Sequence, residues 1–387
     1  MKADNRKPLR VCLINFPYAS MSSSVLLLNQ LQLLEPICDK LYAITGNVPK
    51  EGVFTSKVQL KDTKVAMHFK ESVHPLWWSI LLWILKNILF QIRACLELLK
   101  ISRNIDIVIC YLGIYYLPPM LTAKLLGKKV LKIAVLPESE AAKILYGRRS
   151  VSQRIISLLD RINHSIADYI IVDLENVSQL GLVKYEGKIV PRPRQVDLHL
   201  FESRKPLNER RNLVGFIGRL SKVKGILNFV DAMPMVLEGY PDVEFLVGGG
   251  GTLAHEVEEK IKSYHSDRIT FTGWIPHELL PDYLNEMKLL VVPSVSDTGP
   301  FVAIEAMACG TPVLGSRVGL MAHIIEDGKT GFILENNSPE CIAANIRRAL
   351  ENQELDEIAM RARRLVEEKY SHEAAVEQYQ KSLSRLK

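Results

Sequence analysis

The chain alternates short apolar runs with longer segments of helical periodicity, and it repeats this alternation in both halves. An unbroken apolar run of roughly four to eight residues is typical of a strand covered on both faces of a parallel sheet. Such runs lie at residues 11–15, 40–45, 105–111, 130–136 and 169–172, and again at 213–217, 244–247, 269–272, 289–292, 312–315 and 331–334. Helical patterns fall between them, for example at 22–34, 118–126 and 151–167. This alternation predicts a doubly wound α/β sheet in each half.

A polar, basic segment separates the two halves. It covers 190–211 and contains Pro191, Pro193 and Pro206, which is a composition typical of a linker. The length of 387 residues also favours two domains, because most domains hold about 100–200 residues. The sequence therefore predicts an N-terminal domain over 1–195 and a second domain that begins at 196.

Composition and charge narrow the class of protein. Charged residues make up 24% and hydrophobic residues 48% of the chain, as in folded globular proteins. The net charge of +6 suits anionic partners such as nucleotide diphosphates, lipid headgroups or nucleic acid. The basic residues are dispersed, however, and no recognised nucleic-acid-binding module is present, so we expect no nucleic-acid partner. Six cysteines without C-x-x-C spacing indicate neither a metal site nor a disulfide framework. With no apolar segment of a signal peptide near residue 1, we expect a cytoplasmic protein.

The most apolar segment of the chain, 76–90, has two interpretations. Its length of about 15 residues is less than the roughly 20 that a membrane-spanning helix needs. Ser79, Lys86, Arg93 and Lys100 recur every seven residues, which places them near one side of a helix, opposite three tryptophans and many leucines. One interpretation is an in-plane amphipathic helix that contacts the inner face of a membrane through 76–93. The other is a core helix of the N-terminal domain, and the sequence leaves both open.

Two glycine-containing turns follow predicted strands of the second half, where ligands bind in open α/β sheets. In the first turn, Gly218 is followed by Arg219 and Lys224. Arg219 suits a diphosphate as a bidentate donor, and Lys224 suits it as a point charge. A solvated basic turn without a ligand would have the same sequence pattern. The second turn holds four glycines at 248–251, which permit close approach of a ligand to the backbone, or simply a tight strand-to-helix turn. It lacks the G-x-G-x-x-G pattern of dinucleotide-binding folds, which disfavours NAD.

A third cluster, at 293–313, contains two carboxylates. Asp297 lies on a loop after a predicted strand, and Glu305 lies inside a predicted helix at 301–309. Amides at the start of this helix could hold phosphate or sugar oxygens, because the helix dipole favours negative charge there. Glu305 could accept hydrogen bonds from ribose hydroxyls. Taken alone, the cluster equally fits two solvated acids beside a helix start.

Five motifs follow one another in a fixed order: G-R-L-x-x-x-K-G at 218–225, G-G-G-G at 248–251, F-T-G-W-I-P at 271–276, P-S-x-x-D-x7-E-A-M-A-C-G-T-P-V at 293–313 and D-G-K-T-G at 327–331. Over roughly 213–350 this set resembles the family 4 retaining glycosyltransferases of GT-B fold, in glycosyl transferases group 1. The resemblance implies an α/β fold of two Rossmann-like domains that face a cleft, with 1–195 on the acceptor side and 196–368 binding a nucleotide sugar. The tail looks like that family's last helix, which implies that 369–387 returns to the N-terminal domain.

The resemblance also implies roles for the matching residues. Arg219 and Lys224 would hold the donor diphosphate and stabilise its charge as the glycosidic bond breaks, which leaves no need for a metal ion or another cofactor. Glu305 would bind the ribose. The residues expected to bind the donor are Gly218, Arg219, Lys224, Gly249, Gly250, Gly299, Phe301, Val302 and Glu305, and those expected to act in catalysis are Asp297, Arg219, Lys224 and Glu138.

The chain departs from the family's pattern at four places. Asp297 stands where the family has a glutamate near the donor sugar, and its side chain is one methylene shorter. Residues 134–139 contain no histidine where the family often has one, so Glu138 is the nearest polar candidate. Residues 17–24 replace the usual glycine-rich loop after the first strand, and 319–323 read G-L-M-A-H where G-G-x-x-E is common.

The leading hypothesis from the sequence is transfer of a sugar from a UDP- or GDP-sugar to an acceptor hydroxyl with retention at the anomeric carbon. The basic balance and the segment at 76–90 favour a lipid-linked or cell-surface glycan as acceptor, met by a protein peripheral to the membrane. The alternative is a sugar-nucleotide-binding protein without catalysis, motivated by Asp297 and the missing histidine. An NAD-dependent oxidoreductase is disfavoured by the incomplete fingerprint and by the Arg219/Lys224 pair.

Overall fold

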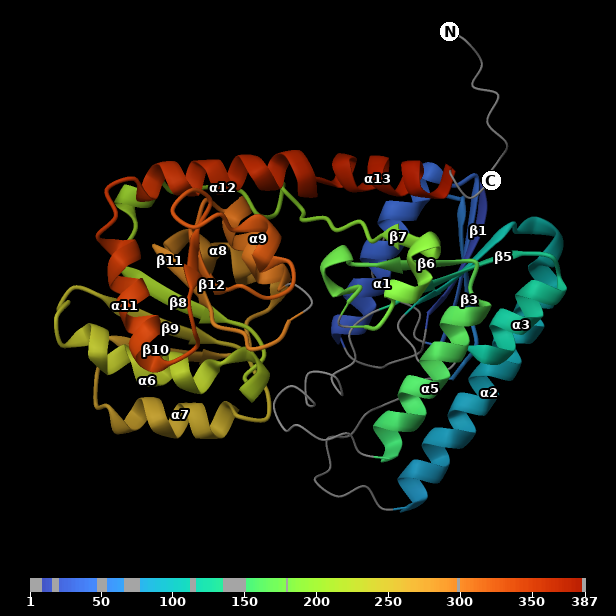
Figure 1. Cartoon of the computed structure of the whole chain (residues 1–387), viewed down its shortest axis with the longest axis horizontal. Coiled ribbons are helices and arrows are strands. Elements are labelled where there is room, and N and C mark those ends of the chain that lie inside the picture. The colour runs from blue at the N-terminus through green and yellow to red at the C-terminus, as the bar shows by residue number, and fades with distance from the viewer. Residues whose placement is uncertain are drawn as a thin grey trace, which may run out of the picture. The chain divides into compact units, whose positions relative to one another are not determined.

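The structure is a computed structural model of the chain (Figure 1), and it describes residues 9–15, 21–46, 54–65, 77–111, 116–134, 151–178, 180–297 and 300–384. The chain divides into two compact units. The first contains the described residues of Met1–Val135, Arg149–Pro193 and Val376–Lys387, and the second contains those of Arg194–Ala375. The chain thus passes from the first unit to the second after Pro193 and returns after Ala375.

The described part of the first unit is built on a seven-stranded parallel sheet with the strand order β3-β2-β1-β4-β5-β6-β7. Its strands are β1 (Arg10–Asn15), β2 (Lys40–Thr45), β3 (Val58–Asp62), β4 (Ile107–Tyr111), β5 (Lys129–Ile133), β6 (Tyr169–Val172) and β7 (Ile189–Pro191). Its helices are α1 (Met21–Leu34), α2 (Trp77–Ile101), α3 (Leu117–Leu125), α5 (Val151–Ile166) and the greater part of α13 (His372–Ser384).

The second unit has a six-stranded parallel sheet with the strand order β10-β9-β8-β11-β12-β13 among its described residues. Its strands are β8 (Leu213–Ile217), β9 (Glu244–Gly248), β10 (Ile269–Gly273), β11 (Leu289–Val292), β12 (Val313–Ser316) and β13 (Phe332–Leu334). Its helices are α6 (Ile226–Leu237), α7 (Ala254–Ser263), α8 (Leu280–Glu286), α9 (Phe301–Ala308), α10 (Met321–Ile324), α11 (Pro339–Leu350) and α12 (Leu355–Tyr370).

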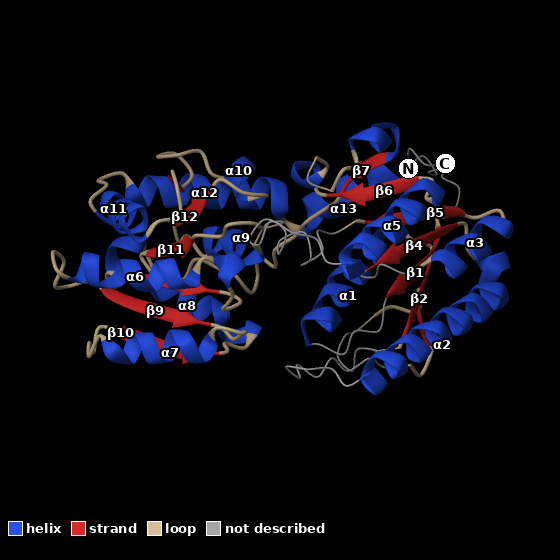
Figure 2. Cartoon of the chain, turned by 60° about the horizontal axis from the view of Figure 1, so that its bottom comes forward, coloured by secondary structure: helices blue, strands red, loops and turns tan. Residues whose placement is uncertain are grey.

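Short 3-10 helices complete the described connections: η1 (Glu35–Ile37), η2 (Ser102–Asn104), η3 (Leu174–Asn176), η4 (Val183–Lys188), η5 (Leu207–Glu209), η6 (Lys222–Lys224) and η7 (His277–Leu279). Figure 2 shows helices on both faces of each sheet. The predicted doubly wound α/β fold is therefore confirmed for both units.

Each sheet has the strand order of a Rossmann fold. Counting from the first strand of each unit, the order begins 3-2-1-4-5-6 in both sheets, which is the usual order of that fold. The direction of the crossover connections reverses between the first and the fourth strand, and ligands bind outside the carboxyl ends of the strands at this switch point. In the second unit the switch point lies between β8 and β11, so the loops that follow these two strands form the expected binding region.

The second unit buries both faces of its sheet, which explains the unbroken apolar runs of its strands. Val214 and Phe216 of β8 belong to one core cluster, whereas Leu213 of the same strand belongs to another. The first cluster also contains residues of α6 and α11, and the second contains residues of α8 and α9. Because successive side chains of a strand point to opposite faces, a strand covered on both sides has no polar face to show in its sequence.

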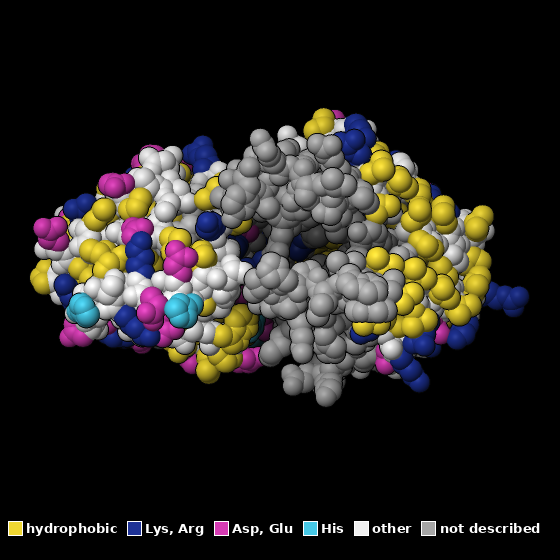
Figure 3. All heavy atoms as spheres, turned by 90° about the horizontal axis from the view of Figure 1, so that it is seen from below, with side chains coloured by type: hydrophobic (Ala, Val, Ile, Leu, Met, Phe, Trp, Pro, Cys, Tyr) yellow, Lys and Arg dark blue, Asp and Glu magenta, His cyan; other side chains and the backbone are white. Residues whose placement is uncertain are grey.

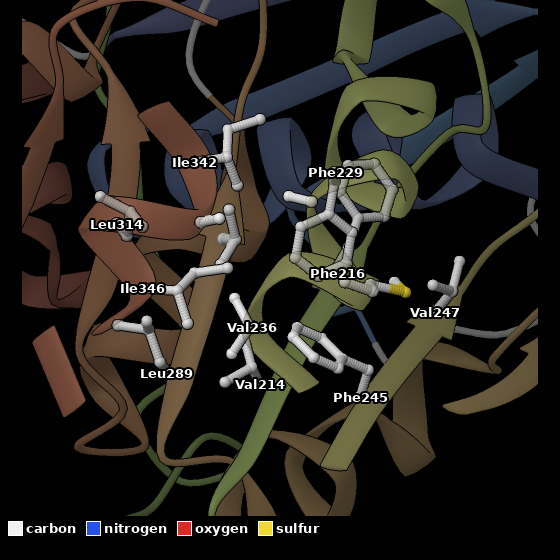
Figure 4. Packing of buried hydrophobic residues seen from close by; sticks show 14 of the residues in the cluster. Val214, Phe216, Phe229, Val236, Phe245, Val247, Leu289, Leu314, Ile342 and Ile346 are labelled. Atoms are coloured by element: carbon white, nitrogen blue, oxygen red, sulfur yellow. The ribbon is translucent and has the colours of Figure 1, made fainter. Parts of the chain in front are cut away.

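Aromatic rings pack closely in the first of these clusters (Figure 4). The ring of Phe229, from α6, lies 5.9 Å from that of Phe216 on β8 and 5.8 Å from that of Phe245 on β9. Pairs at these separations add to the stabilisation that burial alone provides. The rings fix α6 against the strand that leads into the first glycine-containing turn.

Two strands of the first unit, β3 and β7, were not predicted. Both are at the edges of the sheet. The residues of β3 are half-buried or exposed along its length, and β7 is short and ends at Pro191. An edge strand that is partly solvated or limited by proline lacks the apolar run on which the prediction depended.

The last helix, α13, packs within the first unit from Val376 onward. Tyr379 is fully buried, and its hydroxyl lies 3.4 Å from Oε1 of Gln30 on α1. Leu383, one helical turn further, is also fully buried. A terminal helix frays unless side chains hold it in the core, so Tyr379 and Leu383 attach the end of the chain.

We expect Tyr379→Ala to destabilise the protein by about 3–5 kcal/mol, because removal of a fully buried ring leaves a cavity. Tyr379→Phe retains the ring and should cost only about 1 kcal/mol, the net value of one hydrogen bond. Denaturant unfolding monitored by circular dichroism measures both changes. Trypsin should also cleave the Ala variant faster at the exposed Lys381, and equal cleavage of the two variants would contradict the attachment through Tyr379.

Candidate functional site

The loops that follow β8 and β11 are joined to each other at the switch point of the second unit. The amide of Val295 donates to the carbonyl of Val223 at 2.8 Å. Gly225 has a φ of 70°, and a Cβ at this position would lie 2.1 Å from the carbonyl oxygen of Pro293. Asn337 donates from Nδ2 to that same oxygen at 2.6 Å. Only glycine fits at 225, and the close contact that it permits brings the two loops together.

Lys224 and Asp297 form an ion pair across these two loops. Nζ of Lys224 donates to Oδ2 of Asp297, and the hydroxyl of Ser294 donates to the same oxygen at 3.2 Å. The side chain of Asp297 is 8% exposed and that of Lys224 is 24% exposed. Charge-assisted hydrogen bonds of this kind are short and orienting, so the carboxylate holds the ammonium at the end of β11.

Arg219 is an exposed residue on a backbone that is fixed on both sides. The amide of Gly218 donates to the carbonyl of Gly248 at 3.1 Å, and the amide of Leu220 donates to the carbonyl of Gly250 at 2.9 Å. The side chain of Arg219 itself is exposed. An exposed arginine on a fixed backbone suits the recognition of an anion.

Gly249 serves the packing of the two glycine-containing turns. Its φ is 132°, and a Cβ there would lie 1.8 Å from the carbonyl oxygen of Gly218. Its amide donates to the carbonyl of Gly273 at 2.6 Å. Protein atoms therefore occupy both the space and the donor that this glycine offers. At Gly250 a Cβ would meet nothing within 4 Å, so open space lies beside its backbone. The predicted contact of Gly249 and Gly250 with a ligand stays a prediction.

Helix α9 begins shortly after Asp297 in the sequence. Pro300 is its N-cap, and Phe301 and Val302, which are half-buried, form its first turn. The positive end of the helix dipole therefore lies after β11, where it favours an anion. The preceding Gly299 is outside the described residues, so its role stays a prediction.

Glu305 is a buried carboxylate that has a histidine as partner. It lies on α9 and is 8% exposed. Its Oε1 is 3.1 Å from Nε2 of His277, which is on η7. The hydrogen bond to Glu305 is the largest cause that raises the pKa of His277 above 6.5. The ring of His277 also packs edge to face against Phe201 at 5.3 Å, so the imidazole is held from two sides.

His277 was missed by the sequence analysis. It directly follows the F-T-G-W-I-P motif at 271–276, and this adjacency was the available signal. Its pairing with Glu305 spans 28 residues and has no local pattern. A half-exposed histidine beside a buried carboxylate becomes visible only when η7 and α9 are placed next to each other.

The structure brings two of the predicted residues, Lys224 and Asp297, into contact with each other. A third, Glu305, pairs instead with His277, which was not predicted. Glu138 lies outside the described residues, as do all of residues 134–139 except Ala134. Among the residues that the structure does describe, no group of three or more His, Cys, Asp or Glu side chains could hold a metal ion.

Residues 200–369 match the family model described as Glycosyl transferases group 1. This part of the chain is a glycosyl transferases group 1 domain. It contains Arg219, Lys224, Asp297 and Glu305, the charged residues that the motifs singled out. The resemblance to group 1 is therefore confirmed for this domain, while assignment to family 4 and the retaining reaction stay predictions.

Curated relatives of the group 1 domain are glycosyltransferases. The chain is 30% identical over 170 residues to alpha-D-kanosaminyltransferase of Streptomyces kanamyceticus, which covers 43% of this chain and 44% of that protein. It is 28% identical over 176 residues to N-acetyl-alpha-D-glucosaminyl L-malate synthase of Bacillus anthracis, 45% of each chain. The chain thus spans less than half the length of these relatives.

Solved structures match the fold over nearly the whole chain. Anabaena HepE in complex with UDP and glucose matches 97% of this chain and 99% of its own with a TM-score of 0.68 and 16% identity. Sucrose-phosphate synthase of Thermosynechococcus elongatus matches 98% and 99% with a TM-score of 0.71 and 20% identity. At these identities the likeness is one of fold, and the fold of the chain is GT-B-like.

We expect Gly249→Ala to destabilise the group 1 domain strongly, because its Cβ would collide with the carbonyl of Gly218. Backbone strain and steric overlap of this kind cost about 2–4 kcal/mol. Gly250→Ala is the matched control in the same turn, since its Cβ meets open space, and it should change the free energy of unfolding by less than about 1 kcal/mol. Denaturant unfolding of both variants tests this, and equal losses would contradict it.

We expect the pKa of His277 to lie above 6.5 and to fall in Glu305→Gln, since the hydrogen bond to Glu305 is its largest cause. Because the folded-state pKa is raised, the pair stabilises the protein fully below pH 6.5, and this contribution is lost as pH rises through the folded-state pKa. NMR titration of the ring protons measures the pKa. Glu278→Gln removes a charge that acts on His277 only through space and should lower the pKa less; an equal fall in both variants would refute the hydrogen bond as its main cause.

Proposed function

We propose that the chain transfers a sugar from a UDP- or GDP-sugar to an acceptor hydroxyl, with retention of the anomeric configuration. The observation that carries the proposal is the pairing of Lys224 with Asp297 at the switch point of a group 1 domain. One of the relatives, alpha-D-kanosaminyltransferase, is a sugar transferase by its name. HepE, whose fold the chain shares, is in complex with UDP and glucose, which favours UDP as the first nucleotide to try.

The diphosphate of the donor would bind at the end of β8. Arg219 offers a planar pair of donors on a fixed backbone, and Lys224 offers a point charge held close to the end of β11. The start of α9, at Phe301 and Val302, adds the positive end of a helix dipole. Gly218 and Gly250 lie in the two glycine-containing turns, which hydrogen-bond to each other, and Gly250 has open space beside its backbone. Three sources of positive charge would thus meet at one diphosphate.

Glu305 would receive the ribose of the nucleotide. A carboxylate that is nearly buried and already bonded to His277 has a fixed orientation. It can accept hydrogen bonds from two neighbouring hydroxyls, since a carboxylate has lone pairs on both oxygens. His277 would thereby position Glu305 rather than contact the sugar itself.

The reaction would break the bond between the anomeric carbon and the diphosphate oxygen and form a bond from the same face to the acceptor oxygen. The acceptor's proton would leave with the diphosphate. Arg219 and Lys224 would stabilise the charge that grows on the leaving group, a role that preorganised cations perform without a metal ion or another cofactor. Asp297 would lie near the donor sugar, and Glu138 would supply a polar group from the N-terminal domain.

The acceptor in this proposal is a lipid-linked or cell-surface glycan. The chain carries a net charge of +6, which suits an acceptor with phosphate groups. We propose that the protein works in the cytoplasm as a peripheral protein at the inner face of a membrane. None of the described helices is long and apolar enough to cross a bilayer.

The deciding experiment incubates the purified chain with UDP-glucose, UDP-N-acetylglucosamine or GDP-mannose, with and without membrane lipid extract, and follows free nucleotide. Release that Glu305→Ala and Lys224→Ala both abolish would support transfer and identify the donor. The NMR anomeric coupling of the product then tests retention. Binding of nucleotide without release under any condition would instead favour a sugar-nucleotide-binding protein without catalysis.

We expect Lys224→Ala to weaken the binding of UDP by about ten- to a hundredfold, because a charge-assisted hydrogen bond contributes about 1.5–3 kcal/mol. Lys222→Ala is the matched control, since Lys222 is in the same 3-10 helix but exposed, and it should bind UDP nearly as the parent does. Isothermal titration calorimetry measures both constants. Equal weakening in the two variants would mean that UDP senses only the local charge.

A further inference from the structure

Helix α2 has two apolar faces, and only one of them is used by the core. Phe90, Ala94 and Leu98 are fully buried and belong to the core cluster of the first unit. Arg93, between them in sequence, donates to the carbonyl of Thr63 beyond the end of β3. These contacts orient the helix on the sheet. Burial in the core therefore explains why one face of α2 is apolar, but it does not explain why the other face is apolar.

The second stripe of α2 consists of exposed Leu and Ile side chains. They are Leu82, Ile84, Leu85, Ile88, Leu89, Ile92, Leu96 and Leu99, each between 41% and 56% exposed. At about 3.6 residues per turn, this stripe lies opposite the buried one. The interpretation of 76–93 as part of a core helix thus holds for one side of α2. The other side is apolar and exposed, and its contact with a membrane stays a prediction. The side chains of its three tryptophans are outside the described part.

Neighbouring helices extend this apolar surface. α2 packs against α3, and α3 packs against α5. Leu121 and Leu125 on α3 are 45% and 89% exposed, and Leu158 on α5 is 58% exposed. Figure 3 shows hydrophobic side chains gathered in a broad patch on this unit, with Lys and Arg side chains at its margin. We refer to these residues of α2, α3 and α5 as the apolar face. A contiguous face of this kind marks a site of interaction in most proteins.

The charges beside the apolar face are mostly positive. Lys86 and Lys100 on α2, Lys129 after α3 and Arg161 on α5 are exposed. The one acidic residue of α2 is Glu97, which pairs with Lys100 at 2.7 Å, and α3 has none. A second copy of the chain would bring the same positive charges against these, which opposes self-association. A surface of opposite sign complements them.

We propose that the apolar face docks on the surface of a bilayer that contains anionic phospholipid, with α2 lying in the plane of the headgroups. The Leu and Ile side chains would enter the boundary between headgroups and acyl chains, as those of interfacial helices do. The basic residues at the margin would contact the anionic headgroups. Docking at a bilayer also favours a lipid-linked acceptor over a soluble one, an inference that rests on the proposed function.

The test is sedimentation of the full chain with vesicles of phosphatidylcholine, alone or mixed with phosphatidylglycerol. The parent protein should bind the mixed vesicles, and added salt should weaken the binding by screening the headgroup charge. The combined variant Leu85→Gln, Ile92→Gln and Leu96→Gln replaces exposed side chains with another good helix former. We expect it to reduce the partition coefficient at least about tenfold, because three apolar side chains are lost from the interface.

Met360→Gln is the matched control, since Met360 is 54% exposed on α12 of the other unit; it should bind vesicles as the parent does. Equal binding by the combined variant and the parent, or no binding of the parent to mixed vesicles, would overturn the proposal. So would a concentration-dependent dimer in light scattering that the combined variant abolishes. If the combined variant fails to fold by circular dichroism, Lys86→Gln with Lys129→Gln decides: it should weaken binding to the mixed vesicles only, and unchanged binding would overturn the proposal.

Donor hydrolysis in solution separates this proposal from the proposed function. The combined variant should release nucleotide from the donor at the parent's rate without vesicles, because its substitutions are on the other unit from Lys224 and Glu305. Lys224→Ala should bind vesicles as the parent does. Hydrolysis without vesicle binding would refute docking alone, and vesicle binding without nucleotide binding would refute the proposed function alone.

Discussion

The second unit depends on the contact between the loop after β8 and the loop after β11. Gly225 brings its backbone against the carbonyl of Pro293 at a distance that no side chain would allow, and Asn337 donates to the same carbonyl. One further backbone hydrogen bond, from Val295 to Val223, fastens the two loops. Because these loops follow the two strands at the switch point of the sheet, the same contact fixes the positions of Lys224 and Asp297. Packing and binding chemistry are thus determined together.

Much of this arrangement could be predicted from the sequence, for a physical reason. Strands covered on both faces appear as unbroken apolar runs, and the carboxyl ends of parallel strands meet at one edge of a sheet. Lys224 and Asp297 follow two such runs that are neighbouring strands of the sheet, so their approach to each other was predictable from order and spacing. The pairing of Glu305 with His277 was not, because it depends on how η7 packs beside α9. The need for glycine at 249 follows from the close carbonyl of Gly218, a contact between two turns that the sequence alone does not show; its contact with a ligand stays a prediction.

The secondary structure of the first unit was harder to predict from the sequence, because some of its elements are partly exposed to solvent. The edge strand β3 is partly solvated and shows no apolar run. Helix α2 is apolar on two opposite sides, so its periodicity alone could not distinguish core from surface. Only the positions of Phe90 and Leu98 in the core show that Leu85 and Ile92 must face outward. A helix with two apolar stripes is typical of a protein that has a second apolar environment besides its own core.

The ion pair of Lys224 with Asp297 sets a condition on any anion that binds there. Asp297 is the counter-charge of Lys224, so a phosphate that binds Lys224 has to compete with this carboxylate. In the proposed binding mode, a diphosphate would also engage Arg219 and the start of α9, and these additional contacts would offset the competition with Asp297. An ion pair of this kind would therefore distinguish between anions by the number and spacing of their negative charges. If the proposed function holds, this arrangement would favour a nucleoside diphosphate over inorganic phosphate without any contact to the base.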